Sequence, residues 1–192
     1  MTIEKTNALG PYNRFVIWVQ GCMRQCPGCI SKDSQPIDGG SEADTAELAE
    51  TILNVTDIEG LTISGGEPFL QSEALVDLIK RIKSKKDAGV IVYTGNDYEE
   101  IKENELTKYC DIIIDGVYID ELNDGLSLRG SSNQKVCMIT KRYENEVKQL
   151  YGTQGRKIEL HLNKDKTILV GIPEKNSLRL FEESRGVPSQ KI

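Results

Sequence analysis

The stretch FVIWVQGCMRQCPGC, residues 15–29, decides how the rest of the chain is interpreted. Its first five residues are β-branched, aromatic or aliphatic, which is typical of a buried strand. That strand leads directly into a loop that carries Cys22, Cys26 and Cys29. Thiols at this spacing can form a disulfide staple, a zinc site, a redox pair or an iron–sulfur cluster. Each use makes a different demand on the remaining sequence.

Length and composition limit the classes of protein to be considered. The chain has 192 residues, which suits one well-buried domain with an appendage. Hydrophobic residues make up 38% and charged residues 28%, as in a globular protein that folds. The formal net charge of -6 argues against nucleic-acid binding, because neutralising phosphates requires an excess of Lys and Arg.

The sequence also predicts the cellular compartment. No window reaches the apolar length that a bilayer crossing requires, and the first ten residues lack the apolar core of a signal peptide. We therefore expect a cytoplasmic protein without membrane contact. Thiols stay reduced in that compartment, and the five cysteines are odd in number, so a disulfide framework is disfavoured. Metal binding becomes the leading interpretation.

Strand-like and helix-like segments alternate in the first part of the chain. Short apolar runs predict strands, and apolar residues three and four apart predict amphipathic helices. Such alternation implies a parallel sheet covered by helices, with chemistry at the carboxyl ends of the strands. The expected strands span 15–19, 61–64, 90–93 and 111–115, and the expected helices begin at Ser41, follow Pro68 and span 98–108.

A different pattern begins near residue 141. Residues 141–152 predict a charged helix that ends at Gly152. Residues 157–173 predict a hairpin of two alternating strands about a turn at 163–166. We therefore divide the chain into a core at residues 1–140 and a C-terminal extension at 141–192, made of a helix and a hairpin.

The three-cysteine loop can be compared with known metal and redox sites. Structural zinc usually takes four ligands as two pairs, and neither Cys110 nor Cys137 belongs to a second C-x-x-C pair. Cys26 and Cys29 resemble a thioredoxin-type dithiol, a lesser alternative because that motif does not need Cys22. A [4Fe–4S] cluster held by three thiolates would leave one iron without a protein ligand. Such an open position can bind a substrate or a cofactor.

Three further residues have simpler interpretations. We expect Cys110 and Cys137 to be free thiols that behave as small buried hydrophobes. His161 falls on the polar side of an alternation with the apolar residues 158, 160 and 162, so we expect it to face solvent. We assign no catalytic side chain.

A second motif, SGGEP at residues 64–68, follows the second expected strand. The combination of C-x-x-x-C-x-x-C after one strand and SGGEP after the next resembles the radical S-adenosylmethionine superfamily. YTG at 93–95, DIIIDGVY at 111–118 and LRGSSNQ at 128–134 narrow the resemblance to the activating proteins of anaerobic, class III ribonucleotide reductase. These matches occur in the family's order over roughly residues 7–137, and the chain continues to residue 192.

The resemblance implies cofactors and their ligands. Cys22, Cys26 and Cys29 would bind three irons of a [4Fe–4S] cluster, and S-adenosylmethionine would bind the fourth through its amino and carboxylate groups. One electron would cleave S-adenosylmethionine to a 5′-deoxyadenosyl radical, which abstracts a hydrogen atom. The glycines would let the backbone approach the methionyl amino group, and Glu67 would order the loop. The residues expected to bind S-adenosylmethionine are Ser64, Gly65, Gly66, Glu67, Thr94 and Gly95.

The resemblance also implies a fold and a partner. We expect an α/β protein with a partial (β/α) barrel of five to six parallel strands, open on one side, and with Arg129–Asn133 at the mouth. The first functional hypothesis is an enzyme that generates a glycyl radical on anaerobic ribonucleotide reductase, using electrons from a flavodoxin or ferredoxin. The second is a radical S-adenosylmethionine enzyme of similar core that acts on another glycyl radical enzyme, a peptide or a small molecule, with the hairpin tail shaping that specificity. The third is a non-catalytic module in which the iron–sulfur cluster is structural and the tail mediates binding.

Overall fold

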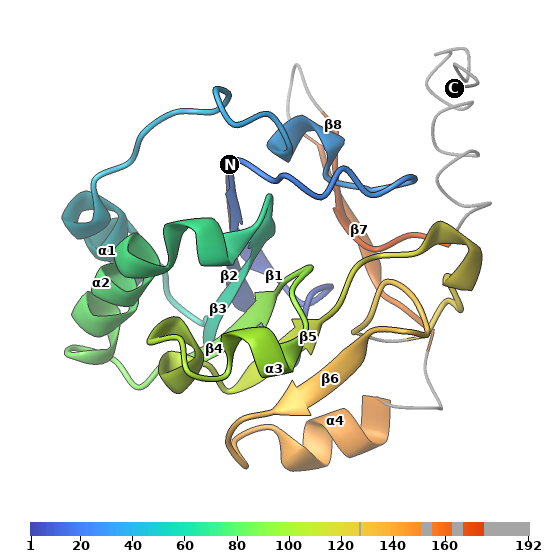
Figure 1. Cartoon of the computed structure of the whole chain (residues 1–192). Helices are drawn as coiled ribbons and strands as arrows, with labels where there is room; N and C mark the ends of the chain where they lie inside the picture. The colour runs from blue at the N-terminus through green and yellow to red at the C-terminus, as the bar shows by residue number, and fades with distance from the viewer. Residues whose placement is uncertain (127, 151–154, 163–166, 175–192) are drawn as a thin grey trace.

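The chain forms one mixed sheet and a separate hairpin in the computed structural model, which describes residues 1–126, 128–150, 155–162 and 167–174 (Figure 1). Six strands pair in sequence order from β1 to β6. Strands β2 to β5 run parallel to one another, whereas β1 and β6 pair antiparallel at the two edges. The strands are β1 Thr2–Thr6, β2 Arg14–Val19, β3 Gly60–Gly65, β4 Gly89–Tyr93, β5 Ile112–Asp115 and β6 Lys135–Met138.

The expectation of five to six parallel strands is wrong, because four strands are parallel. A parallel connection needs a crossover of a dozen or more residues. The segment 7–13 between β1 and β2 is too short for one, so β1 pairs antiparallel. The connection 116–134 is long enough, but its described part holds only a short 3-10 turn and no crossover helix. The protein therefore has an α/β fold with a mostly parallel six-stranded sheet.

The helices follow the strands as predicted, with shifted ends. Helix α1 spans Thr45–Asn54 and begins later than the expected start at Ser41. Its first turn is capped by the Asp44 carboxylate, which accepts hydrogen bonds from the amides of Ala46 and Glu47. The remaining helical segments, with η marking a 3-10 turn, are η1 Lys32–Ser34, η2 Pro68–Gln71, α2 Ser72–Lys83, α3 Tyr98–Ile101, η3 Leu106–Tyr109, η4 Asp120–Leu122 and α4 Glu144–Leu150.

The helix expected over residues 98–108 is broken in two. Helix α3 ends at Ile101, and η3 begins only at Leu106. Between them, the Asn104 side-chain oxygen accepts a 2.9 Å hydrogen bond from the Leu106 amide. The Thr107 hydroxyl donates to the Ile101 carbonyl at 2.7 Å. These local side-chain bonds satisfy backbone groups that a continuous helix would otherwise pair, so the helix stops.

Two layers cover opposite faces of the sheet, because successive strand side chains point to opposite sides. The α1 and α2 helices lie together on one side of the sheet (Figure 1). The other face packs against the start of α4 and against the hairpin. The first face buries Phe15, Ile17, Leu61, Ile63, Val90, Val92 and Ile113, and the second buries Val16, Ile91, Ile112 and Ile114.

The hairpin consists of β7 Ile158–Leu162 and β8 Thr167–Gly171, as predicted. Its expected turn at 163–166, and the expected helix end at Gly152, lie outside the described residues. The prediction for His161 is wrong, because its side chain is half-buried while the flanking Leu160 and Leu162 are exposed. The reason is tertiary: the face of β7 that carries His161 is turned toward the body of the protein.

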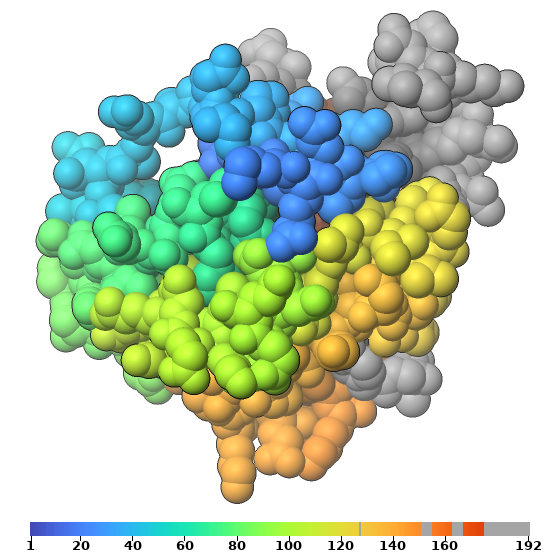
Figure 2. Space-filling view, in the orientation of Figure 1, coloured from blue at the N-terminus to red at the C-terminus, as the bar shows by residue number. Residues whose placement is uncertain are grey.

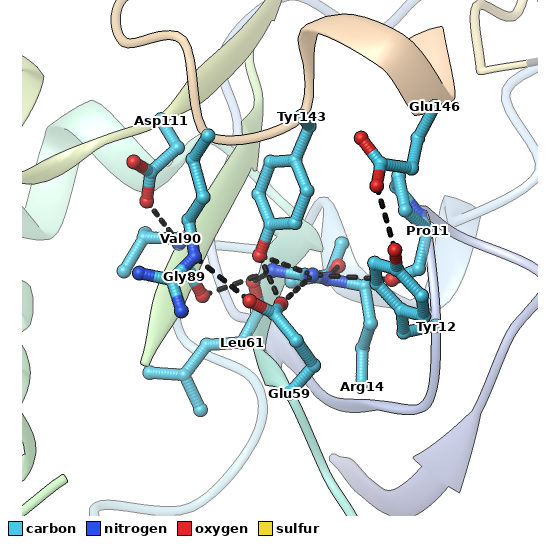
Figure 3. A network of polar contacts seen from close by, with 12 residues as sticks. Pro11, Tyr12, Arg14, Glu59, Leu61, Gly89, Val90, Asp111, Tyr143 and Glu146 are labelled. Atoms are coloured by element: carbon cyan, nitrogen blue, oxygen red, sulfur yellow. Dashed lines mark hydrogen bonds and ion pairs between the residues drawn. The ribbon is translucent and has the colours of Figure 1, made fainter. Parts of the chain in front are cut away.

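A buried arginine ties the amino ends of the parallel strands together (Figure 3). Arg14, at the start of β2, is fully buried and donates to the Leu61 carbonyl at 2.5 Å and the Gly89 carbonyl at 2.9 Å. It also donates to the Tyr143 hydroxyl and pairs with the Glu59 carboxylate at 3.0 Å. The Tyr143 hydroxyl donates to the same carboxylate. This network pairs a buried charge and holds one end of the sheet, leaving the carboxyl ends for chemistry.

Cys110 and Cys137 are both free thiols. Cys110 is buried as expected, whereas Cys137 is only half-buried and packs against the edge of the core. Within the described ranges, no helix combines the length and apolar character needed to cross a bilayer.

Candidate functional site

A cavity of about 560 Å³ opens at the carboxyl ends of β2, β3 and β4. Its volume lies in the range of small-molecule and cofactor sites. Its walls come from the cysteine loop after β2, the SGGEP loop after β3, the turn after β4 and the hairpin. All the residues expected to bind the cluster or S-adenosylmethionine line it: Cys22, Cys26, Cys29, Ser64, Gly65, Gly66, Glu67, Thr94 and Gly95.

The cysteine loop is closed at its base by backbone hydrogen bonds. The amides of Gly21 and Cys22 donate to the carbonyls of Ser34 and Gln35 at 2.8 and 2.9 Å. Gly28 has a φ of +73°, a conformation that glycine adopts without steric cost. These features fold the loop, which is more than ten residues long, back toward the end of β2, the strand that precedes it. In the space-filling view the loop (blue) lies against the segment that follows β3 (green) (Figure 2).

The Cys26 thiol lies in the electrostatic field of the other two loop cysteines. Burial raises the pKa of the Cys26 thiol, and the neighbouring Cys29 and Cys22 raise it further. A backbone hydrogen bond from Tyr118 acts in the opposite direction. All three thiols are free and partly exposed to the same cavity. Among the described residues, however, no three Cys, His, Asp or Glu side chains lie close enough together to hold a metal ion.

The donor set nevertheless fits an iron–sulfur cluster. Three thiols on one loop line a shared cavity, and in their deprotonated form they would be the soft ligands that such clusters take. A wall without a fourth cysteine leaves room for a ligand of another kind. The cavity is large relative to the thiols that line it, so a nucleotide-sized molecule can share it with the cluster.

Gly65 lies against the end of β2, and Gly66 lies against the cysteine loop. Gly65 has a φ of +101°, and a Cβ there would lie 2.6 Å from the Val19 carbonyl oxygen. A Cβ on Gly66 would collide with the Gly21 carbonyl oxygen. The Gly66 amide donates to Val19 at 2.8 Å, and the Glu67 amide donates to Gly21 at 2.7 Å. Close packing of the SGGEP loop against β2 and the cysteine loop therefore explains the glycines, in addition to any approach of a ligand.

The Glu67 side chain joins the SGGEP loop to the next strand. One carboxylate oxygen accepts from the Thr94 hydroxyl at 2.7 Å and from the Phe69 amide at 3.1 Å. The other accepts from the Gly95 amide at 2.9 Å. Glu67 is 5% exposed, so these bonds replace water almost completely. The expectation that Glu67 orders this loop agrees with these contacts.

With the geometry in place, the chain was compared with known proteins. Residues 8–137 match the family described as 4Fe-4S single cluster domain. The chain belongs to this family.

Several relatives carry names of activating proteins. Those of enterobacteria phage T4 and Vibrio cholerae are each named anaerobic ribonucleoside-triphosphate reductase-activating protein. The phage protein is 33% identical over 136 residues, which cover 68% of this chain and 87% of the relative. The Vibrio protein is 33% identical over 142 residues, covering 68% and 91%. The pyruvate formate-lyase-activating enzyme of Clostridium pasteurianum is 32% identical over 110 residues, covering 55% and 45%.

These relationships make the protein a radical S-adenosylmethionine activating enzyme of the 4Fe-4S single cluster family. The cofactors of this class are a [4Fe–4S] cluster and S-adenosylmethionine. The relatives' names are those of enzymes and activators, which disfavours the non-catalytic module.

Sequence reasoning missed a link within the site of this 4Fe-4S protein. The Arg24 guanidinium, between the first two cysteines, donates a 2.6 Å hydrogen bond to the Asn96 side chain. Its aliphatic part fills the space where a Cβ on Gly95 would lie. Asn96 in turn donates to the Thr94 hydroxyl at 3.0 Å. A cationic residue between two cysteines was the only signal in the sequence, and its partner lies 72 residues away.

The LRGSSNQ motif contributes Gly130 and Gln134 to the cavity wall. Gln134 accepts from the Gly130 amide at 2.8 Å and donates to the Gly116 carbonyl at 2.7 Å. Of the segment Arg129–Asn133, expected at the mouth, only Gly130 lines the cavity. The Arg129 guanidinium instead pairs with Asp124 at 2.5 Å.

The hairpin supplies a wall that the sequence did not predict. Val170 of β8 is fully buried against Leu9 and Val16, which holds β8 over the sheet. Residues Leu169, Gly171, Ile172, Pro173 and Glu174 line the cavity. The hairpin lies beyond residue 137, where the match to the 4Fe-4S family ends.

Proposed function

We propose that this protein generates a glycyl radical on an anaerobic ribonucleotide reductase by reductive cleavage of S-adenosylmethionine. One observation carries the proposal: the cysteine loop and the SGGEP loop, which lie far apart in the sequence, line a single cavity. The names of the phage and Vibrio relatives supply the identity of the partner.

In this proposal Cys22, Cys26 and Cys29 hold the cluster as thiolates. When bound, the cofactors would supply one chemistry: one-electron reductive cleavage of S-adenosylmethionine, coupled to removal of a hydrogen atom from a glycine Cα of the partner. Residues Ser64 to Glu67, with Thr94 and Gly95, bind S-adenosylmethionine. The hydrogen bonds of Glu67 keep the SGGEP loop and the β4 turn at a constant separation, so the cofactor enters a preformed site.

The cavity also needs an opening for the partner. We infer that the sheet acts as a partial barrel with an open side, because its edge strands β1 and β6 do not pair with each other to close it. An open side would admit a loop of another protein to the carboxyl ends of the strands.

The division into a core at 1–140 and an extension at 141–192 stays a prediction, and so does the cytoplasmic location. So does the electron donor, a flavodoxin or ferredoxin.

The test begins with anaerobic reconstitution of the full chain with iron and sulfide. Wild type reduced with dithionite should convert S-adenosylmethionine to 5′-deoxyadenosine and methionine. Cys26→Ala should lose bound iron and this activity. Cys137→Ala is the matched control, because it removes a half-buried thiol outside the cavity and should keep both. A fully loaded wild type without cleavage would refute the proposal.

The identity of the partner needs a second measurement. Mixing the loaded, dithionite-reduced protein with S-adenosylmethionine and anaerobic ribonucleotide reductase should produce a glycyl radical doublet in electron paramagnetic resonance. The Clostridium relative motivates a competing candidate, since its name states activation of pyruvate formate-lyase. A doublet on pyruvate formate-lyase, with none on the reductase, would favour that alternative.

A further inference from the structure

The hairpin turns its apolar side outward. On β7, Ile158 is 38%, Leu160 53% and Leu162 74% exposed. Leu169 of β8 pairs with Leu160, and directly paired residues share one face of a hairpin. We call Ile158, Leu160, Leu162 and Leu169 the apolar hairpin face. A contiguous exposed surface of this kind usually marks an interaction site.

The opposite face of the hairpin is anchored, so the apolar hairpin face cannot turn inward. Val170 is fully buried against Leu9 and Val16. Glu159, which pairs with Val170, accepts a 2.9 Å hydrogen bond from the Asn7 amide. Because side chains alternate along a strand, fixing Glu159 and Val170 inward fixes their neighbours outward.

The apolar hairpin face is continuous with the candidate site. Leu169 lines the cavity, and Leu160 lies directly opposite it in the hairpin register. The apolar surface therefore extends from the cavity wall to Leu162, the most exposed of these side chains. A molecule that covers the face and also enters the cavity must be larger than S-adenosylmethionine.

We propose that the apolar hairpin face docks the protein substrate, beside the polypeptide loop that enters the cavity. This inference rests on the proposed function, because a radical delivered to a protein requires that protein to cover the cavity mouth. The relatives' names state that they activate another protein. The hairpin lies outside residues 8–137, which match the family, so it adds partner contact to a shared core.

The first test measures partner affinity. Leu160→Ser/Leu162→Ser should weaken the binding of anaerobic ribonucleotide reductase to the loaded full chain at least about tenfold, because burying one leucine already contributes that much. Met138→Ser is the matched control: this exposed apolar residue lies on β6 opposite Ile112, at the amino end of β5. The control should bind as wild type. The double variant should unfold at the wild-type temperature, since both leucines are exposed.

The design separates this inference from the proposed function. Dithionite-driven cleavage of S-adenosylmethionine without the reductase should be the same in wild type and the double variant. Absence of cleavage, or of a glycyl radical, in wild type refutes the proposed function. Normal radical formation in wild type together with unchanged affinity in the double variant refutes docking alone. Leu162→Lys, at the most exposed position, gives a second reading of affinity if the double variant folds poorly.

Oxidative footprinting identifies what covers the face. Leu160 and Leu162 should be oxidised by hydroxyl radicals in the free protein and protected when the reductase is added. Protection that rises with concentration of the protein alone would assign the face to a second copy and overturn the proposal. Protection in the dilute free chain, lost on truncation after Glu174, would assign it to the chain's own tail and also overturn it.

Discussion

The Thr94 hydroxyl donates a 2.7 Å hydrogen bond to the Glu67 carboxylate, across two loops that follow different strands. The contact joins the carboxyl end of β4 to the SGGEP loop of β3. Its geometry depends on parallel pairing of these strands, which places their ends at one edge of the sheet. A buried carboxylate is thus used as a spacer between two walls of the cavity.

Glu67→Gln should raise the KM for S-adenosylmethionine and lower the free energy of unfolding by about 1–3 kcal/mol. The amide can accept on one oxygen only, so its NH2 group would face a donor at Thr94 or Gly95. Thermal unfolding and 5′-deoxyadenosine formation measure the two effects. Glu73→Gln, at an exposed position in the first turn of α2, should change neither. Wild-type values for Glu67→Gln would show that the carboxylate does not space the loops.

Arg24→Met should raise the KM for S-adenosylmethionine roughly 3- to 10-fold while iron content stays at the wild-type level. The substitution removes the hydrogen bond to Asn96 but leaves the cysteines in place. Lys32→Met removes the same charge from an exposed position in the same loop and should act as wild type. If Lys32→Met raised the KM for S-adenosylmethionine as much as Arg24→Met, the loss of a positive charge would explain the effect, and the hydrogen bond to Asn96 would not.

Tyr143→Phe should lower the free energy of unfolding by about 1–3 kcal/mol, because Arg14 and Glu59 lose a buried partner. Cleavage of S-adenosylmethionine per folded molecule should not change, since the network lies at the amino ends of the strands. Tyr12→Phe removes an exposed hydroxyl that donates to Glu146 at 2.6 Å and should cost less than about 0.5 kcal/mol. Chemical denaturation compares the two. Equal losses would contradict a special role for the buried hydroxyl.

Burial raises the pKa of the Cys110 thiol to about 12. Unfolded chains lose this proton near pH 9, so above that pH the unfolded state binds fewer protons than the folded state. The free energy of unfolding should therefore fall as pH rises from 9 to 10.5, with Cys110 contributing up to about 1.4 kcal/mol per pH unit. Cys110→Ala should show a shallower decline in anaerobic urea unfolding. If the free energy of unfolding fell equally steeply with pH in wild type and in Cys110→Ala, the Cys110 thiol would be excluded as the source of the decline.

Local patterns were enough to predict much of this protein. The apolar run at 15–19, the spacing of the cysteines and the SGGEP motif lie within short windows, and each acts through neighbouring residues. Apolar periodicity likewise predicted α2 and the hairpin. The same local information failed at residues 98–108, where Asn104 and Thr107 pair with nearby backbone and end the helix.

The sequence by itself determined the cluster-binding chemistry, the order of the central strands β2 to β5 with the helical segments between them, and the family resemblance, because these depend on residue type and spacing. Only the tertiary structure decided that the edge strands β1 and β6 pair antiparallel. It also decided that the Glu67 carboxylate accepts a hydrogen bond from Thr94 and that the leucines of β7 face solvent. Alternation along β7 defines two faces but not which one is buried. That choice was made by Val170 and Glu159, whose partners Leu9, Val16 and Asn7 lie at the other end of the chain.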